Sequence, residues 1–385
     1  MTLHRARMKR TMLVMLCFSS TAAVSFGSIW ESPDWALTSV DEVGIGYDSN
    51  LYARHDGDGD GYIELDPGLL LKRLKSFTDL EITFSVKSTD YFTRSDLNSF
   101  DPSLDIELRY PYDEFVFPTQ QFDVRASRST IVDGDIGGRL RAQDLTTGWI
   151  GNIVASEKTI LQGRASVDQT DYLTKGFSTN EFATAGLTLA YVANENLEVG
   201  AGYDYKYATS QPQDSAIPET NLSQNILSVR GRGDFLPKVS GFFSAGVADS
   251  AYSGDVSQSY LDLEGDLGIV WQATERGKFT LKANRQSYFS PDGSAYLTTT
   301  FGPEWTEEFA TEYFATLGID FLQTLNHFSI GSRTDHAYGG HFELTHSLSE
   351  RYSAALTVRY ITQNSPQLVY NYNRATVYAS FVAKF

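Results

Sequence analysis

The most specific spacing of metal-binding residue types lies in one acidic, glycine-rich stretch. Asp56, Asp58 and Asp60 alternate with glycines and are followed by Tyr62-Ile63-Glu64. This order matches the first nine positions of a calcium loop, but the twelfth position, where a bidentate glutamate should stand, is Pro67. The flanks are patterned as strands, so the stretch predicts an acidic hairpin loop on the cell exterior. Ca²⁺ at Asp56, Asp58 and Asp60 is the secondary hypothesis, and no other cofactor is expected.

A second group that could do chemistry consists of four histidines near the C-terminus, His327, His336, His341 and His346. A hydrolase would need a nucleophile and an orienting group that converge on one of them. His341 and Glu343 share a strand face, but the sequence places no serine beside them. The pattern favours surface or lumen histidines and a protein that is not an enzyme.

The third group is a set of charges on the polar faces of alternating segments. Asp262, Glu264 and Asp266 form an acidic stripe, and the adjoining segment carries Lys278 and Lys282 on its polar face. Eight arginines occupy comparable positions: Arg125, Arg139, Arg141, Arg164, Arg230, Arg232, Arg351 and Arg359. As pore-lining candidates these groups have two compatible roles. They can pair across strands and stiffen the wall, or they can set a transverse field that orients charged solutes.

The elements that position these charges alternate with period two. Leu261, Leu263 and Leu267 oppose the acidic stripe, and the same alternation recurs along the chain to its last residue, Phe385. Such segments are strands with one apolar and one polar face. Apart from the N-terminal leader, no run approaches the ~20 apolar residues of a membrane helix.

Aromatic residues distinguish a membrane barrel from a soluble sandwich. They gather at expected strand ends, as in Tyr203–Tyr205–Tyr207, Tyr110–Tyr112, Tyr288–Phe289 and Tyr370–Tyr372. Two interfacial aromatic girdles and a terminal phenylalanine that closes an alternating strand are typical of outer-membrane barrels. The fold class predicted is an all-β, transmembrane, antiparallel barrel.

Strand counting supports this architecture. Eighteen strands are expected near 42–54, 61–74, 77–92, 101–112, 119–132, 138–155, 158–171, 181–193, 196–209, 222–235, 238–252, 258–272, 276–289, 294–308, 310–324, 336–348, 350–363 and 372–385. Tight connections alternate with longer polar ones, as periplasmic turns alternate with external loops. The segments 119–132 and 138–155 are the least regular, so sixteen strands is the alternative count.

Composition excludes several other classes of protein. The 385 residues carry a net charge of −17, which argues against a nucleic-acid binder. Aromatic residues make up 13% of the chain, which argues against a disordered acidic protein. The single cysteine, Cys17, excludes a disulfide framework. Residues 1–27 have the basic, apolar and small-residue order of a removable export signal, which leaves 28–385 as the barrel.

The two opening strands also carry a family resemblance. Val43-Gly44-Ile45-Gly46-Tyr47-Asp48-Ser49-Asn50-Leu51-Tyr52 is followed by Tyr62 to Asp66 and Pro67-Gly68-Leu69. These residues resemble the start of the beta-barrel porin 2 family. The resemblance implies an outer-membrane barrel associated with exopolysaccharide export, and it supplies no catalytic residues.

The function predicted is passage of polar material, with the outer-membrane exit of a secreted polysaccharide placed first. A diffusion porin for small polar solutes or ions is the alternative, and a barrel hydrolase is the third hypothesis. The partners expected are outer-membrane lipid and lipopolysaccharide, the barrel assembly machinery and a periplasmic polysaccharide export protein.

Overall fold

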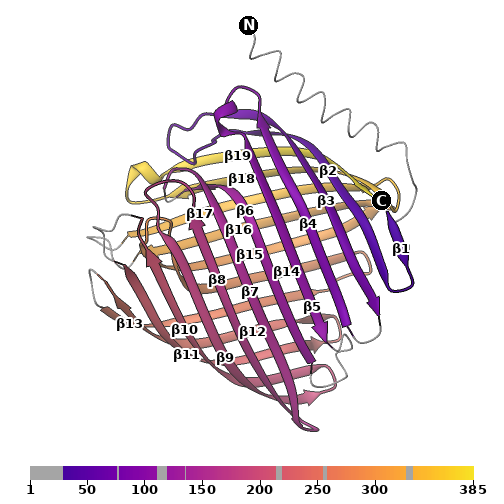
Figure 1. Ribbon diagram of the computed structural model, residues 1–385, viewed down its shortest axis with the longest axis vertical. Coiled ribbons are helices and arrows are strands. Elements are labelled where there is room, and N and C mark those ends of the chain that lie inside the picture. The colour runs from indigo at the N-terminus through magenta and orange to yellow at the C-terminus, as the bar shows by residue number, and fades with distance from the viewer. Residues whose placement is uncertain are drawn as a thin grey trace.

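The protein forms one closed antiparallel barrel, shown by a computed structural model that describes residues 29–75, 78–110, 119–134, 136–213, 219–254, 258–326 and 333–385. Strands β2 to β19 pair in chain order, and β19 returns to pair with β2 (Figure 1). The wall therefore has eighteen strands, as predicted, and the short β1 adds a hairpin on β2. The expected segments 119–132 and 138–155 are β6 and β7, which excludes the sixteen-strand count.

The strand bounds are as follows: β1 Trp30–Ser32, β2 Trp35–Asp48, β3 Asp60–Lys75, β4 Thr78–Tyr91, β5 Ser99–Tyr110, β6 Thr119–Asp133, β7 Gly138–Ser156, β8 Thr159–Tyr172, β9 Thr179–Asn194, β10 Leu197–Gln211, β11 Thr220–Leu236, β12 Val239–Ser253, β13 Gln258–Trp271, β14 Gly277–Phe289, β15 Ala295–Ala310, β16 Tyr313–Asn326, β17 Arg333–Ser347, β18 Tyr352–Asn364 and β19 Tyr372–Lys384. Two single 3₁₀ turns, η1 (Ser95–Leu97) and η2 (Leu368–Tyr370), lie in loops. Within the residue ranges that the structure describes, no helix is long and apolar enough to cross a bilayer.

The wall separates an apolar outer face from a polar inner face. Leu261 and Leu263 on β13 are 73% and 67% exposed, and Leu227 on β11 is 67% exposed. The neighbours of Leu261 and Leu263, Asp262 and Glu264, point the other way, because successive side chains of a strand alternate. An exposed apolar belt on a closed barrel is the arrangement that lipid requires, since the strands hydrogen-bond to one another around the wall.

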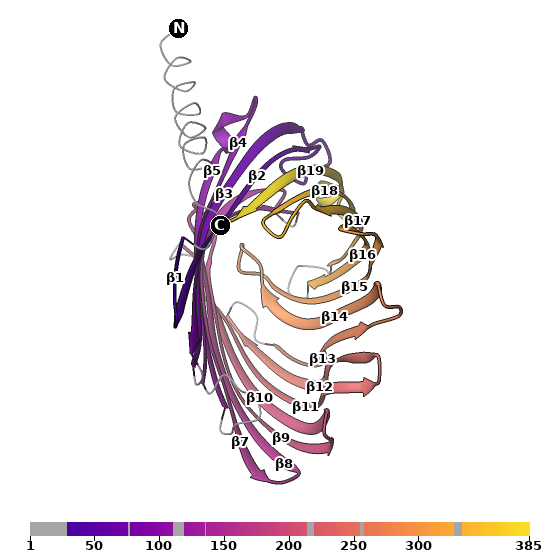
Figure 2. The same ribbon diagram turned by 90° about the vertical axis from the view of Figure 1, so that its right-hand side faces the viewer.

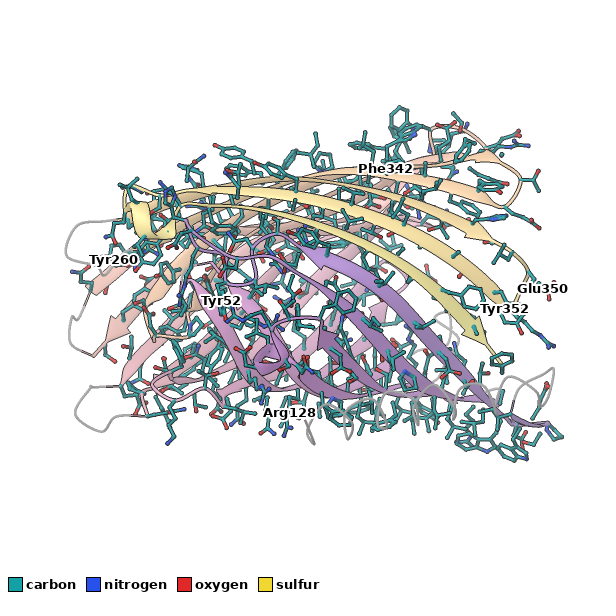
Figure 3. All side chains as sticks on the ribbon, turned by 90° about the horizontal axis from the view of Figure 1, so that it is seen from above. Tyr52, Arg128, Tyr260, Phe342, Glu350 and Tyr352 are labelled. Atoms are coloured by element: carbon teal, nitrogen blue, oxygen red, sulfur yellow. The ribbon has the colours of Figure 1, made fainter. Side chains whose placement is uncertain are left out.

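The first and last strands begin and end at the same rim of the barrel. The backbone amide of Ser39 donates to the carbonyl of Phe385 at 2.7 Å, and the amide of Phe385 donates back at 2.9 Å. Short connections such as 157–158 and 195–196 lie at this rim, which we call the periplasmic end. Figure 3 shows Glu350 and Tyr352 at this end and Tyr260 at the opposite, extracellular end.

The first long strand differs from its prediction. It spans Trp35–Asp48 rather than 42–54, and residues 49–54 form a loop instead. Leu51 and Ala53 are fully buried there, because the loop folds over the barrel mouth. The Asn50 amide donates to the carbonyls of Arg54 and Asn373, which ties the loop to β19. Leu51 and Tyr52 continue the alternating pattern in sequence, but their burial comes from the loop and not from the wall.

The wall parts between β13 and β14 in its extracellular half. These strands pair over only seven positions, from Gly265↔Arg285 to Trp271↔Phe279. Beyond Arg285, β14 stays paired with β15 up to Phe289↔Ala295. The outer half of β14 therefore parts from β13, and together with β15, which stays paired with β16 from Tyr296↔Asn326, it turns into the barrel, as Figure 2 shows.

Candidate functional site

The inward-turned hairpin occupies part of the extracellular half of the lumen. Phe289 and Ala295 pack against Ala208 of β10, Leu222 of β11 and Tyr252 of β12, and all five are buried. The prediction that Tyr288–Phe289 belong to an aromatic girdle is therefore wrong, because Phe289 is 3% exposed and lies inside the barrel. Tyr203, Tyr205 and Tyr207 do lie exposed on the outer face, as a girdle requires.

Polar contacts fix the hairpin tip to β9 and the loop before it. The Asn180 amide donates to the carbonyls of Phe289 and Ser290 at 3.2 and 3.0 Å, and the Ser210 hydroxyl donates to the Asn180 oxygen at 2.6 Å. The backbone amide of Ser178 donates to the carbonyl of Pro291 at 2.8 Å. Each contact satisfies a group that would otherwise be buried without a partner.

A second polar cluster holds the stem of the hairpin. The Ser287 amide and hydroxyl both donate to Glu264 of β13, at 3.0 and 2.9 Å. The Gln224 amide of β11 donates to Glu264 at 2.9 Å, and Lys206 of β10 donates to the Ser287 carbonyl at 2.7 Å. Glu264 thus has a structural role at the hairpin in addition to its place in the predicted acidic stripe.

Below the hairpin, the lumen holds a cavity of about 810 Å³ whose walls carry both signs of charge. Its cations come from β8, β10, β11 and β14, and its carboxylates come from β6, β8, β10 and β13. The charged residues that line it are Asp123, Arg164, Asp168, Glu198, Asp204, Lys206, Arg230, Arg232, Glu264, Asp266 and Arg285. A polar lumen enclosed by low-dielectric lipid strengthens the field between such groups.

One buried carboxylate organises the cationic wall of this cavity. Asp204 of β10 is 1% exposed and accepts from Arg164 of β8 at 2.8 and 2.7 Å and from Arg230 of β11. Arg230 also donates to the Thr188 hydroxyl at 2.5 Å. Two guanidinium groups share one carboxylate, so this cluster keeps a net positive charge. Arg164 remains 42% exposed and faces the lumen.

Two glycines make room for this cluster. A Cβ at Gly186 of β9 would lie 1.9 Å from an Asp204 oxygen, and one at Gly202 of β10 would lie 2.4 Å from the Arg230 guanidinium carbon. The charged side chains therefore lie flat against the wall only where the neighbouring residue has no side chain. Asp204 and these glycines share one face of the alternating pattern, which is the sequence signal that could have identified the cluster.

A second cavity of about 460 Å³ lies against β4–β7 and shares Asp123 with the first. Its wall is mainly acidic, with Glu81, Asp105 and Glu107, and it is balanced by cross-strand partners. Arg125 contacts Asp105 at 2.6 Å, and Lys72 contacts Glu81 at 2.7 Å. These pairs are partly exposed to the lumen and add little stability each.

The predicted pore-lining residues fall into three groups. Asp262, Glu264 and Asp266 share the inward face of β13, and Glu264, Asp266, Arg230 and Arg232 line the larger cavity. Lys278 and Lys282 share the face of Asn284, which pairs with Asp266, so they also face inward. Arg351 instead lies in the turn before β18, at the periplasmic rim, because β18 begins at Tyr352.

Arg359 belongs to a separate charged row on β15–β18. It donates to Asp320 at 3.1 Å, and His341 lies 3.5 Å from Asp320 and 3.6 Å from Glu304. This row is cross-strand pairing across the lumen face. Two other predicted lumen arginines hold the mouth instead: Arg139 stacks its guanidinium on Tyr91, and Arg141 donates to the carbonyl of Asn98.

The histidines do not converge on one point. His346 stacks on Tyr313 at a centroid distance of 3.9 Å, and the His336 ring lies near Phe321. Within the described part of the chain, the charged groups beside His341 are the carboxylates of Asp320 and Glu304. His327 lies outside the described residues.

The acidic loop is an extracellular connection between β2 and β3, as predicted. Asp60 accepts from the backbone amides of Thr93 and Arg94 at 2.8 and 2.9 Å, which links this loop to the next one. Arg94 also hydrogen-bonds Asp96, and this lowers the pKa of the Asp96 carboxyl. Within the part of the chain that the structure describes, no three His, Cys, Asp or Glu side chains come together as a metal cluster. Asp56, Asp58 and Asp60 are therefore not gathered around one point.

A closed barrel with an apolar outer belt, tyrosines at its rim and a charged lumen has the architecture of an outer-membrane protein. The protein is an eighteen-stranded outer-membrane β-barrel with a hairpin folded into its lumen.

No protein-family model matches the chain, and no curated protein matches it. The solved structures that are similar to it include the unliganded ferric citrate transporter FecA, with 9% identity, a TM-score of 0.48, and coverage of 90% of this chain and 78% of that one. They also include OpdK of Pseudomonas aeruginosa with vanillate, with 8% identity, a TM-score of 0.47, and coverage of 90% and 99%. OccAB3 of Acinetobacter baumannii has 9% identity, a TM-score of 0.47, and coverage of 91% and 99%. At these identities and TM-scores the likeness is one of general architecture and carries no argument about function, and the family resemblance of the opening strands stays a prediction.

Proposed function

We propose that the protein is a non-enzymatic channel that passes small polar and charged solutes across the outer membrane. The observation that carries this proposal is the cavity of about 810 Å³, which lies inside a closed barrel and is lined by charged side chains of both signs. A solute that enters the cavity replaces part of its hydration water by contacts with these charged side chains. This exchange favours polar solutes over apolar ones.

The exposed arginines of the cavity indicate which charge of solute it favours. Arg164 and Arg232 are 42% and 49% exposed in the lumen, although each has a carboxylate partner. Guanidinium groups bind carboxylates and phosphates through paired N–H donors. Small anionic or zwitterionic solutes are therefore the cargo that this wall fits best.

Exit of a secreted polysaccharide is the second candidate, and it is supported by the resemblance of residues 43–69 to an export-associated family. The docked hairpin argues against it, because a polymer in transit occupies the whole pore length at once. Its tip contacts β9, and its stem contacts β10, β11 and β13.

The test is conductance of the purified barrel in planar bilayers under a salt gradient. The double variant Arg164→Gln and Arg232→Gln should lower the anion-to-cation permeability ratio, because it removes two lumen cations. Arg276→Gln, in the 272–276 turn outside the cavity, is the matched control and should leave the ratio unchanged. Absence of conductance from every preparation would contradict the channel function.

Deletion of the gene separates the two cargoes. Loss of small-solute uptake with unchanged secreted polysaccharide supports the proposed function, whereas loss of secreted polysaccharide alone supports polymer exit.

A further inference from the structure

The carboxylates that line the smaller cavity are balanced by cations, with one exception. Three of them form ion pairs at 2.6 to 2.7 Å: Glu81 with Lys72, Asp105 with Arg125 and Glu107 with Arg109. The fourth, Asp123 of β6, has no hydrogen-bond or ion-pair partner within the described residues. Asp123 also lines the larger cavity, so its unpaired charge faces the space that the proposed solute enters.

The cationic cluster of the larger cavity has an excess of the opposite sign. Asp204 is the shared partner of Arg164 and Arg230, so one of their two positive charges is not balanced. Arg164 donates to Asp204 from Nε and Nη2, at 2.8 and 2.7 Å, and its side chain is 42% exposed. Its Nη1 group has no partner in the part of the chain that the structure describes. A guanidinium group can use such free donors to bind a carboxylate.

Two glycines set the distance between these charges. A Cβ on Gly148 of β7 would lie 2.4 Å from an Asp123 oxygen, so the Asp123 carboxylate lies over β7. A Cβ on Gly186 of β9 would lie 1.9 Å from an Asp204 oxygen, so the carboxylate that holds Arg164 lies over β9. The two glycines pair with successive inward residues of β8. Because neighbouring strands are about 4.8 Å apart, the two charges are about 10–12 Å apart.

The surface between the two charges is suited to a short hydrocarbon chain. Ile150 is the next inward residue of β7 after Gly148, pairs with Arg164 across the strands and is 36% exposed. Ser166 pairs with Gly148 and also lines the cavity. With a charge-assisted hydrogen bond of about 2.8 Å at each end, the gap accepts an ammonium and a carboxylate about 5–6 Å apart. An ω-amino acid such as γ-aminobutyrate has this length, whereas an α-amino acid is shorter.

The charges of the whole cavity favour a solute that carries both signs. Its lining has six carboxylates and five basic side chains, so it is close to neutral. A simple anion would satisfy Arg164 and leave Asp123 without a partner, and a simple cation would do the reverse. A zwitterion compensates both charges and adds none, which leaves no unpaired charge away from bulk water.

We propose that the larger cavity binds short zwitterionic solutes of the ω-amino acid class, with the ammonium on Asp123 and the carboxylate on Nη1 of Arg164. This inference rests on the proposed channel function, because it names the solute that the lumen selects. It gives Asp123, Gly148 and Ile150 a role in the cavity that the pairing of the wall does not explain.

The test is binding of small probes to the purified barrel, measured by titration calorimetry in detergent and by block of single-channel current. The probes are γ-aminobutyrate, butyrate, butylamine and glycine. γ-Aminobutyrate should bind at least about tenfold more tightly than the others, because only this probe reaches both charged groups. Equal affinity for butyrate and γ-aminobutyrate would overturn the zwitterion site, as would the absence of γ-aminobutyrate binding.

Each end of the site has its own variant. Asp123→Asn should weaken γ-aminobutyrate binding about tenfold and leave butyrate binding unchanged, whereas Arg164→Gln should weaken both. Glu343→Gln is the matched control, because Glu343 is a lumen carboxylate of β17 that bonds Thr345 and lies outside the cavity lining. Equal losses of both probes in Asp123→Asn would contradict the contact between Asp123 and the ammonium.

A change of selectivity separates the site from simple misfolding of a variant. Asp123→Glu lengthens the acidic side chain and should shift the preference from γ-aminobutyrate to the shorter β-alanine, which a misfolded barrel cannot do. An unchanged preference would contradict the site. Binding in the expected pattern without any conductance would support the site and contradict the channel function, whereas conductance without γ-aminobutyrate binding would contradict the site alone.

Discussion

The barrel has two unusual seams between neighbouring strands. The seam between strands far apart in the sequence is continuous, whereas the seam between consecutive strands is not. The β19–β2 seam joins the two ends of the chain, with Asp48 and Arg374 separated by 326 positions, yet it is paired and pinned. The β13–β14 seam joins consecutive strands across a short turn, yet it parts after seven residue pairs. Chain connectivity alone therefore does not decide where this wall is continuous.

The residues at the outer end of each seam account for the difference. At the closing seam, Asp48 is 2% exposed. It accepts from the Arg374 guanidinium at 2.7 to 3.2 Å and from the backbone N–H of Asn50 at 3.0 Å. At the parted seam, the Ser287 hydroxyl donates to Glu264 across the gap, and it also accepts from the Gln224 side chain of β11. A buried ion pair fixes one alignment, whereas hydroxyl and carboxylate contacts are readily exchanged.

The largest expected effect is at the closing seam. Asp48→Ala should lower the free energy of unfolding by about 3 kcal/mol, because it leaves the half-buried Arg374 without its counter-charge. The measurement is the urea midpoint of the barrel refolded in lipid vesicles. Asp48→Asn, which keeps the acceptor oxygen, should lose less.

Asp105→Ala is the matched control for that substitution, because the Arg125–Asp105 pair is 66% and 38% exposed. It should change the stability by about 0–1 kcal/mol. Equal losses from Asp48→Ala and Asp105→Ala would remove the contrast between a pinned seam and an ordinary lumen pair.

An intermediate effect is expected at the parted seam. Ser287→Ala removes a hydroxyl that donates to Glu264 and accepts from Gln224, and it should weaken hairpin docking by about 1 kcal/mol. Hydrogen exchange should become faster at the amides of residues 286–298, while the urea midpoint stays constant. A lower midpoint with unchanged exchange would mean that the hairpin unfolds only with the whole barrel.

A small effect on stability is expected at the last residue. Phe385→Ala keeps the two backbone bonds to Ser39 and loses only an edge contact with the Tyr352 ring, with centroids 5.9 Å apart. The loss should be about 0.5–1.5 kcal/mol for the refolded barrel. If the terminal phenylalanine is the signal for the assembly machinery, the amount of barrel in cell membranes should fall far more than this stability predicts.

The fold was predictable from sequence because alternation is a local property of each strand. Leu261 and Leu263 have to face lipid wherever β13 lies, so the strand count and the two faces followed from the pattern. The same reasoning failed at Leu51 and Phe289, which have the residue types of wall positions. Leu51 is buried in a loop, and Phe289 is buried because its strand turns inward.

The site was only partly predictable for a related reason. Alternation places Asp204 and Arg230 on the polar face, and their strands are adjacent in sequence order, so their meeting could be anticipated. The contact of Asn180 with Ser290 spans 110 positions and depends on the parting of β13 and β14, which period-two patterns do not encode. Arg351 was placed wrongly because a strand boundary moved by two residues.

The Asp48–Arg374 pair also bears on how the barrel is completed during synthesis. The last strand is the last to be made, and it must find the first strand without a connecting turn to set its alignment. A slip by one residue would exchange the two faces of β19 and carry Arg374 to the lipid side. Arg374 meets Asp48 only in the correct register. The ion pair therefore stabilises the native closure of the barrel relative to closures that are shifted by one residue.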